Sequence, residues 1–283
     1  MDAGALSPVQ ETALATAYAR ALDSRSPRSI LGDTVADEVV GRIDFDFTGL
    51  GVTRGVVCLV AVRARMLDDR IRGFVAEHPD AVVVDLGAGL STGVFRVDPP
   101  PTVDWYSVDL PGMIALREVS LPHRDRSHSV AASVAESDWL RAIPAGRPAI
   151  VFADGLFPFL SDAVVAETVG RITGHFRSGV LAFNDYGTVS RLNRFAKLVM
   201  ARKPMFRTMY GQWAFRGFRD ARTPERWNAG LELVEETSAM HAPEVALFPP
   251  LLRFGSRVGA RVPAVASKAR VLCYRFEPPD HAR

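Results

Sequence analysis

Two glycines and two carboxylates of the sequence have a spacing that suits a nucleotide-like ligand. Gly87 and Gly89 follow a valine-rich run that ends in Asp85. Two glycines separated by one residue let the backbone turn sharply and approach a ligand closely. Asp109 stands 20 residues after Gly89, at the end of the next apolar run, where a carboxylate can accept hydrogen bonds from ribose hydroxyls. A plain turn at the glycines and a helix-capping role for Asp109 remain the alternatives.

The charge of this loop favours a cationic ligand over a dinucleotide. The sequence continues with Leu90, Ser91 and Thr92, so it lacks the third glycine of the dinucleotide fingerprint. Asp85 at the strand tip attracts a cation and repels a pyrophosphate. S-adenosylmethionine carries a sulfonium and an ammonium group. The loop therefore predicts an S-adenosylmethionine site.

Alternating apolar strands and helices must position these residues. This order is typical of βαβ units around a parallel sheet, so the fold class is α/β. The predicted strands cover residues 81–86, 103–108, 128–132, 149–153, 180–184, 231–237 and 271–276. The predicted helices cover residues 11–22, 33–40, 56–77, 111–119, 162–176, 188–200 and 223–229.

The order of elements also predicts the domain organisation. Residues 1–78 are helical and precede the first strand, so we expect them to form an N-terminal helical cap. Residues 79–283 form the cofactor-binding α/β domain, and an insertion at about 188–228 joins the cap.

Composition limits the other classes of function. The net charge is only +2, which argues against a dedicated nucleic-acid binder. Cys58 and Cys273 stand alone in apolar surroundings and predict buried, reduced thiols. His123 and His128 are the nearest approach to a metal-binding spacing, and we expect no metal. With no signal peptide and no apolar run of about 20 residues, the sequence predicts a cytoplasmic protein without a membrane partner.

Several motifs together resemble the leucine carboxyl methyltransferase superfamily, in particular its bacterial branch of tetracenomycin-type polyketide O-methyltransferases. The similarity covers most of residues 10–240. It is carried by HPD at 78–80, VVDLGAGL at 83–90, WYSVDLP at 105–111, SVAESDW at 133–139 and ADGL at 153–156, with further matches ARALDS at 19–24 and IDFDF at 43–47.

The resemblance implies a class I methyltransferase, with a Rossmann-like sheet that is mostly parallel and has an antiparallel late strand. It implies that Arg63 pairs with the cofactor carboxylate, as a guanidinium fork suits a carboxylate. Asp154 replaces a glutamate or glutamine of the family near the methionyl end. The other implied cofactor residues are Asp85, Gly87, Ala88, Gly89, Asp109 and Leu110 at the loop and ribose, and Ser133, Val134 and Glu136 beside the adenine.

One segment departs from the family pattern. After the glycine loop the family has an acidic residue followed by Thr-Arg or Thr-Gln, whereas this chain has Ser91, Thr92 and Gly93. The small Gly93 leaves open space or a different substrate contact in this interpretation.

Methyl transfer mainly requires alignment of the acceptor with the methyl group. A carboxylate is already ionised at neutral pH, whereas a phenol benefits from a base. No histidine is expected at a strand tip, so a carboxylate is favoured over a hydroxyl acceptor. The positioning candidates are Asn184, Asp185 and Tyr186, and the substrate-binding candidates are Tyr18, Arg20, Tyr210, Trp213 and Arg216.

The sequence therefore predicts an O-methyltransferase for a polyketide-like or other natural-product acceptor, acting as a monomer or homodimer. Two alternatives stay open. One is methylation of a protein C-terminal carboxylate, and the other is a non-catalytic accessory protein that only binds S-adenosylmethionine.

Overall fold

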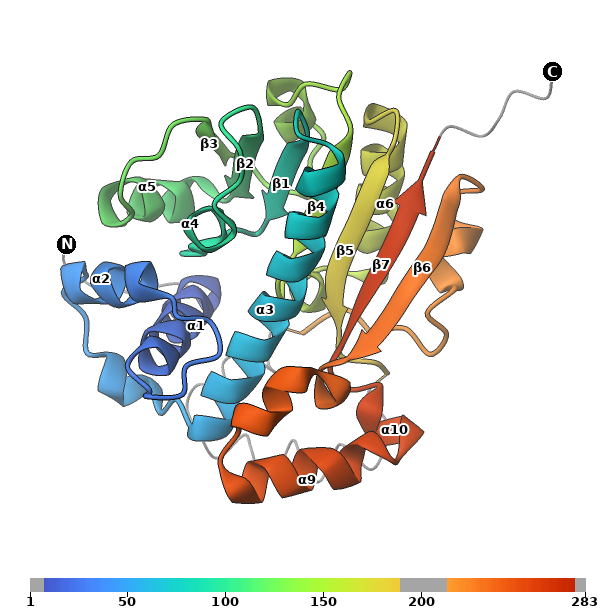
Figure 1. The fold of residues 1–283 in the computed structure, drawn as a ribbon. Helices are drawn as coiled ribbons and strands as arrows, with labels where there is room; N and C mark the ends of the chain where they lie inside the picture. The colour runs from blue at the N-terminus through green and yellow to red at the C-terminus, as the bar shows by residue number, and fades with distance from the viewer. Residues whose placement is uncertain (1–7, 189–212, 278–283) are drawn as a thin grey trace.

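The computed structural model describes residues 8–188 and 213–277. Most of the predicted helix at 188–200, and Tyr210, therefore lie outside the described residues. Within the described part, helices pack on both faces of one seven-stranded sheet (Figure 1).

The strand order is β3-β2-β1-β4-β5-β7-β6. The first five strands are parallel, and β7 runs antiparallel to both of its neighbours. The predicted sheet, mostly parallel with an antiparallel late strand, is confirmed. The strands are β1 Val82–Leu86, β2 Asp104–Asp109, β3 Ser127–Ala131, β4 Ala149–Ala153, β5 Gly179–Asp185, β6 Leu231–Ser238 and β7 Arg270–Phe276.

The pattern of apolar and polar residues in each strand matches its burial. Every residue of β1 and β4 is buried, because helices cover both faces of the parallel part and such strands become continuous apolar runs. At the edge, β6 alternates in its first residues between inward Leu231 and exposed Glu232. The continuous apolar run is therefore a clear sequence signal for β1, which leads into the glycine loop.

Helices follow the strands with caps that the sequence supplies. The Thr53 and Ser161 side chains accept hydrogen bonds from Val56 N and Val164 N at the starts of α3 and α6. Pro111 opens α5, where a missing N–H costs nothing. The helices are α1 Pro8–Ser24, α2 Thr34–Arg42, α3 Arg54–Glu77, α4 Gly93–Val97, α5 Pro111–Ser120, α6 Asp162–His175, α9 Pro250–Ala260 and α10 Pro263–Ala266.

Short 3-10 turns complete the described chain. They are η1 Phe47–Leu50, η2 Asp138–Ala142, η3 Phe157–Phe159, η4 Thr223–Arg226, η5 Ala239–His241 and η6 Pro243–Leu247. The helix predicted at 223–229 is thus only the short turn η4. The sequence interpretation did not include α9 and α10.

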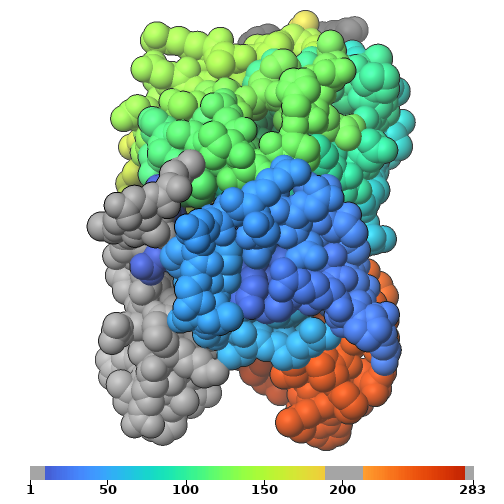
Figure 2. Space-filling view, turned by 90° about the vertical axis from the view of Figure 1, so that its left-hand side faces the viewer, coloured from blue at the N-terminus to red at the C-terminus, as the bar shows by residue number. Residues whose placement is uncertain are grey.

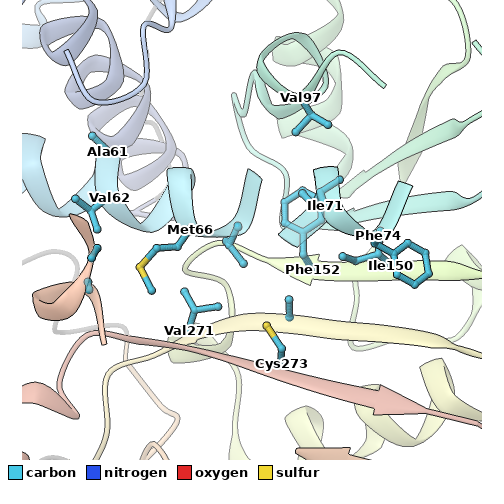
Figure 3. Packing of buried hydrophobic residues seen from close by; sticks show 14 of the residues in the cluster. Ala61, Val62, Met66, Ile71, Phe74, Val97, Ile150, Phe152, Val271 and Cys273 are labelled. Carbon is cyan, nitrogen blue, oxygen red and sulfur yellow. The ribbon is translucent and has the colours of Figure 1, made fainter. Parts of the chain in front are cut away.

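The long helix α3 covers one face of the sheet. Its Met66 and Ile71 pack with Phe152 of β4 and Val271 of β7 in one buried cluster (Figure 3). The other face is covered by α6, whose Val169 is fully buried. This packing fixes α3 against the strand tips.

Two N-terminal helices lie outside α3. Leu14 and Ala17 of α1 pack with Val39 of α2 in a separate cluster, and together these helices cover the middle of the molecular face in Figure 2. The division of the chain at residue 78 stays a prediction. Of the helices in the described residues, none is both long and apolar enough to cross a membrane.

Candidate active site

A cleft lies at the carboxyl ends of the parallel strands, where open α/β sheets bind ligands. It has an empty volume of about 860 Å³, which includes space that is open to solvent. Its lining comprises Thr12, Ala13, Thr16, Arg20, Arg63, Asp85, Gly87–Ser91, Asp109, Met113, Asp154–Leu156, Pro158, Phe159, Tyr186 and Trp213.

The glycine loop adopts a backbone that other residues avoid. Gly87 has φ 65° and Gly89 has φ 47°, in the left-handed region that favours glycine. A Cβ on Gly87 would lie 2.8 Å from Leu156 Cδ1. The loop thus needs glycine for both its conformation and the close approach of Leu156.

Asp109 fixes this loop to the end of β2. Its Oδ2 accepts a hydrogen bond from Gly89 N at 2.7 Å, and its Oδ1 accepts one from Leu110 N at 2.7 Å. Burial raises the pKa of the Asp109 carboxyl. A carboxylate has about four lone-pair sites, so Asp109 keeps acceptor capacity toward the cleft.

Asp85 is a buried carboxyl on the cleft wall. Burial raises its pKa to about 7, although the nearby Arg117 cation opposes the rise. Its Oδ2 has no hydrogen-bond partner among residues 8–188 and 213–277. A cation in the cleft would favour the ionised form of this carboxyl.

Arg63 of α3 links this helix to the ends of two strands through an ion pair and a hydrogen bond. Arg63 Nη2 of α3 lies 3.1 Å from Asp154 Oδ1, after β4. Arg63 Nη1 also donates a hydrogen bond to Tyr186 Oη, after β5. The cleft therefore presents a guanidinium and a carboxylate side by side, which suits a zwitterionic amino-acid group.

Asn184, a predicted positioning residue, does not line the cleft. The last register pair of β4 and β5 is Ala153 with Phe183, so Asp154 and Asn184 are the residues that follow this pair on the two chain segments. The Asn184 side chain is buried, and within the part of the chain that the structure describes neither its Oδ1 nor its Nδ2 is hydrogen-bonded. Leaving both atoms unpaired is costly, which marks Asn184 as a group without its full set of partners.

Asp185 faces a structural partner. Its Oδ2 accepts a hydrogen bond from Arg270 Nε at 2.7 Å, and its Oδ1 accepts one from Phe218 N. Arg270 is its register partner on β7. The structure therefore places this predicted positioning residue away from the cleft lining, in the anchor of the β5 end.

Aromatic side chains form part of the cleft wall. The rings of Tyr186 and Trp213 lie 5.1 Å apart at 39°, and Phe159 also lines the cleft. Sequence reasoning missed Phe159, which follows β4 by six residues.

Helix α1 closes the cleft from a third side. Thr12, Thr16 and Arg20 recur every four residues and line the cleft, so they share one helix face. Arg20 Nη2 donates a hydrogen bond to Leu90 O at 3.0 Å. The two threonines were missed, and their four-residue spacing with Arg20 was the available signal.

Comparison with known proteins identifies the family of this chain. The profile of the leucine carboxyl methyltransferase family matches residues 13–173. The chain belongs to this family. It is 38% identical over 272 residues to the tetracenomycin polyketide synthesis O-methyltransferase TcmP of Streptomyces glaucescens, covering 96% of this chain and 98% of that protein. The protein is an S-adenosylmethionine-dependent methyltransferase.

Two further comparisons agree. The S-adenosyl-L-methionine-dependent methyltransferase dpfgK of Gibberella zeae is 30% identical over 204 residues, covering 65% of this chain and 68% of that protein. A crystal structure from Thermobifida fusca YX, described as that of a methyltransferase, superposes on this chain with a TM-score of 0.53 at 18% identity. The match covers 92% of this chain and 94% of that chain. The second likeness shows the fold alone.

The family departure at residues 91–93 has a structural reason. Thr92 is buried, and its hydroxyl donates a hydrogen bond to Asp33 Oδ2 at 2.5 Å. A Cβ on Gly93 would lie 3.2 Å from Trp105 Cζ2. The expected open space at Gly93 is therefore wrong, because the Trp105 ring fills it, and only Ser91 of this segment lines the cleft.

A buried ion network lies behind this segment of the methyltransferase. Arg96 Nε donates to Asp68 Oδ2 at 2.7 Å, and Arg96 Nη1 donates to Asp33 Oδ2 at 2.8 Å. The two carboxylates raise the pKa of Arg96 despite its burial. The network joins α2, α3 and α4, and so supports the wall of the cleft.

The remaining substrate-binding candidates lie elsewhere. The Tyr18 ring packs 5.2 Å from that of Phe47, because it lies off the α1 face that lines the cleft. Arg216 is exposed and forms an ion pair with Asp162.

The other predicted cofactor residues do not line the cleft. Leu110 is 45% exposed at the start of α5. Ser133, Val134 and Glu136 lie in the loop after β3, and their roles beside the adenine stay predictions. In the part of the chain that the structure describes, no group of three or more His, Cys, Asp or Glu residues could hold a metal ion. Cys58 and Cys273 are buried and unpaired, as predicted.

Proposed function

We propose that this methyltransferase methylates an oxygen of a small aromatic natural product, and that the acceptor oxygen belongs to a carboxylate. The supporting observation is that the glycine loop, a buried arginine and three aromatic side chains line one cleft. The aromatic wall consists of Phe159, Tyr186 and Trp213, and the arginine is Arg20.

The residues of the cleft fit S-adenosylmethionine, which supplies a methyl group activated by a sulfonium. Asp109 would hold the ribose, while Arg63 and Asp154 would hold the carboxylate and ammonium of the methionyl end. The unpartnered Oδ2 of Asp85 supplies negative charge on the same wall. The positive φ of Gly87 and Gly89 keeps side chains out of the space that the cofactor requires.

The acceptor would lie between α1 and the aromatic wall. Planar aromatic rings stack favourably on Tyr and Trp side chains. Holding the acceptor in this slot orients its oxygen and excludes water, and such alignment can supply roughly 7–11 kcal/mol of the barrier reduction.

A carboxylate acceptor agrees with the charges of the cleft. Such a group is ionised at neutral pH, so it needs a cationic anchor but no general base. The side chain of Arg20 is only 5% exposed, with Nε 3.8 Å from Asp33 Oδ2. We propose that Arg20 attracts the acceptor anion. The word carboxyl in the family's name supports a carboxylate acceptor, and the polyketide in TcmP's name supports a natural-product acceptor.

We assign Asn184 the role of a positioning residue. Its carboxamide has no hydrogen-bond partner among the described residues, and Asn184 and Asp154 directly follow the last register pair of β5 and β4. We propose that the carboxamide hydrogen-bonds the Asp154 carboxylate once the cofactor's carboxylate competes for Arg63. We further propose that residues 1–78 and about 188–228 form the cap that selects the acceptor, and that the enzyme acts in the cytoplasm as a monomer or homodimer.

Methyl transfer from radiolabelled S-adenosylmethionine tests this function. The purified full chain is incubated with a polycyclic aromatic carboxylic acid, with its preformed ethyl ester and with the corresponding phenol. We expect labelling of the acid, and mild alkali should release the label as methanol because a methyl ester hydrolyses whereas an aryl ether does not. Label that resists alkali would assign a hydroxyl acceptor. S-adenosylhomocysteine binding without transfer to any acceptor would support the accessory role.

A further inference from the structure

The helices α9 and α10 expose an apolar stripe on the surface. The stripe consists of Leu251, Phe254, Val258, Val262 and Val265. It accounts for five of the eight large apolar residues that are exposed in the described part of the chain. Leu251 is 82% and Phe254 is 67% exposed, so both protrude into solvent.

The stripe occupies one face of α9. Leu251, Phe254 and Val258 have the spacing of a single helix face, and the opposite face meets the protein through Leu252 and Ser256, which line a small apolar pocket against α3. No residue of α9 is buried. Packing against the protein therefore leaves the apolar face of α9 uncovered.

Basic side chains flank the stripe. Arg253, Arg257 and Arg261 recur every four residues and follow one edge of α9. Among residues 8–188 and 213–277, no carboxylate forms an ion pair with any of the three. Residues 250–266, which form α9 and α10, contain three Arg but no Asp or Glu, so the surface complements an anionic partner.

The charge argues against two other occupants. A second copy placed symmetrically on this stripe would bring equal surfaces together, and their arginines would repel. The segment 189–212 has six Lys and Arg and no Asp or Glu, so its charge does not complement α9 either.

We propose that the α9–α10 surface docks the enzyme on an anionic lipid membrane. An amphipathic helix with Leu and Phe on one face and arginines beside them lies in the plane of a lipid interface, and each arginine gains from anionic headgroups. The sequence predicted no membrane partner because it has no apolar run long enough to span a membrane. A helix that lies on the membrane surface needs only one apolar face.

The docking surface lies at the end of the sheet where the cleft opens. α10 leads into Arg270 of β7, which pairs with Asp185 at the end of β5. Tyr186, the next residue, lines the cleft. Figure 1 shows α9 and α10 beyond this end of β5 and β7. A docked enzyme would therefore hold its cleft close to the lipid surface, where apolar acceptors accumulate.

Cosedimentation of the full chain with vesicles tests the proposal. We expect binding to vesicles of phosphatidylglycerol and phosphatidylcholine, much weaker binding to phosphatidylcholine alone, and loss of binding at high salt. Phe254→Ser should weaken binding at least several-fold, and replacing Arg253, Arg257 and Arg261 together by Gln should weaken it roughly 100-fold. The matched control is Val119→Ser, which removes an equally exposed apolar residue from α5 and should bind like the wild type.

Circular dichroism and S-adenosylhomocysteine affinity establish that each variant is folded. Equal binding of Phe254→Ser and the wild type, or equal binding to neutral and anionic vesicles, would overturn the proposal. A dimer that forms without lipid and is dissolved by Phe254→Ser would instead assign the stripe to a second copy.

Discussion

The two walls of the cleft are built in different ways. The cofactor wall comes from adjacent parallel strand tips, where Asp85, Gly87 and Gly89 are near neighbours in sequence and Asp109 is held by the loop itself. The acceptor wall combines α1, Phe159, Tyr186 and Trp213 from distant parts of the chain. The glycine loop of the first wall is specified locally, whereas the second wall exists only when the whole fold is formed. Substitutions on the two walls should therefore separate cofactor affinity from acceptor affinity.

The largest effect is expected for Gly87→Val. The φ of 65° and the 2.8 Å approach to Leu156 leave no room for a side chain, so the loop must move out of the cofactor site. We expect S-adenosylhomocysteine binding to fall below detection in isothermal titration calorimetry. Gly170→Ala, in α6 with open space around it, is the control and should bind normally. Wild-type affinity in Gly87→Val would contradict the loop assignment.

Arg63→Ala tests the methionyl end of the same wall. A charge-assisted hydrogen bond contributes about 1.5–3 kcal/mol, so the S-adenosylhomocysteine Kd should rise roughly 10- to 100-fold. Arg65→Ala removes a half-exposed arginine of the same helix that pairs with Asp69 and should leave Kd unchanged. If both variants bind equally well, Arg63 does not hold the cofactor carboxylate.

The pH dependence of binding depends on Asp85. Its pKa of about 7 means that the carboxyl is mostly neutral at pH 6 and ionised at pH 8. Because a cationic ligand prefers the ionised form, S-adenosylmethionine affinity should rise about tenfold over this interval, with proton release on binding. Asp85→Asn should remove this dependence. An unchanged pH profile in the variant would exclude Asp85 as its source.

The same carboxyl has the opposite effect on the stability of the ligand-free protein. Its folded-state pKa lies above the unfolded value of about 4, so the folded state binds the proton more tightly. Stability should therefore fall as the pH rises from 4 through 7, by about 1 kcal/mol between pH 6 and pH 8. Urea unfolding of the wild type and Asp85→Asn at the two pH values measures this difference.

The smallest effect, and the one that separates the walls, is expected for Trp213→Ala. Loss of one aromatic stacking contact costs about 0.5–1.5 kcal/mol, so the acceptor KM should rise roughly 2- to 12-fold. The S-adenosylhomocysteine Kd should change little, because Trp213 lies on the acceptor wall. A larger change in Kd than in KM would show that the two walls are not independent.

The accuracy of the sequence predictions follows the same division. All seven strands of the described sheet were located within one residue at each end, including β3 and β6, which are partly exposed. The cofactor residues Gly87, Gly89, Asp109 and Arg63 all line the cleft. Asp185 and Arg216 do not, because each pairs with an ion partner that is distant in sequence, Arg270 for the former and Asp162 for the latter.

The sequence by itself determined the α/β class, the family and the glycine loop, because apolar strand runs and the spacing of the glycines are local features of the sequence. Only the tertiary structure decided which side chains meet across the cleft. Thr92 and Gly93 stood out in the sequence as a departure near the substrate, yet Asp33 and Trp105 contact them from distant segments. The exposed stripe of α9 is likewise invisible to local patterns, since an amphipathic helix has the same sequence whether its apolar face is covered or open.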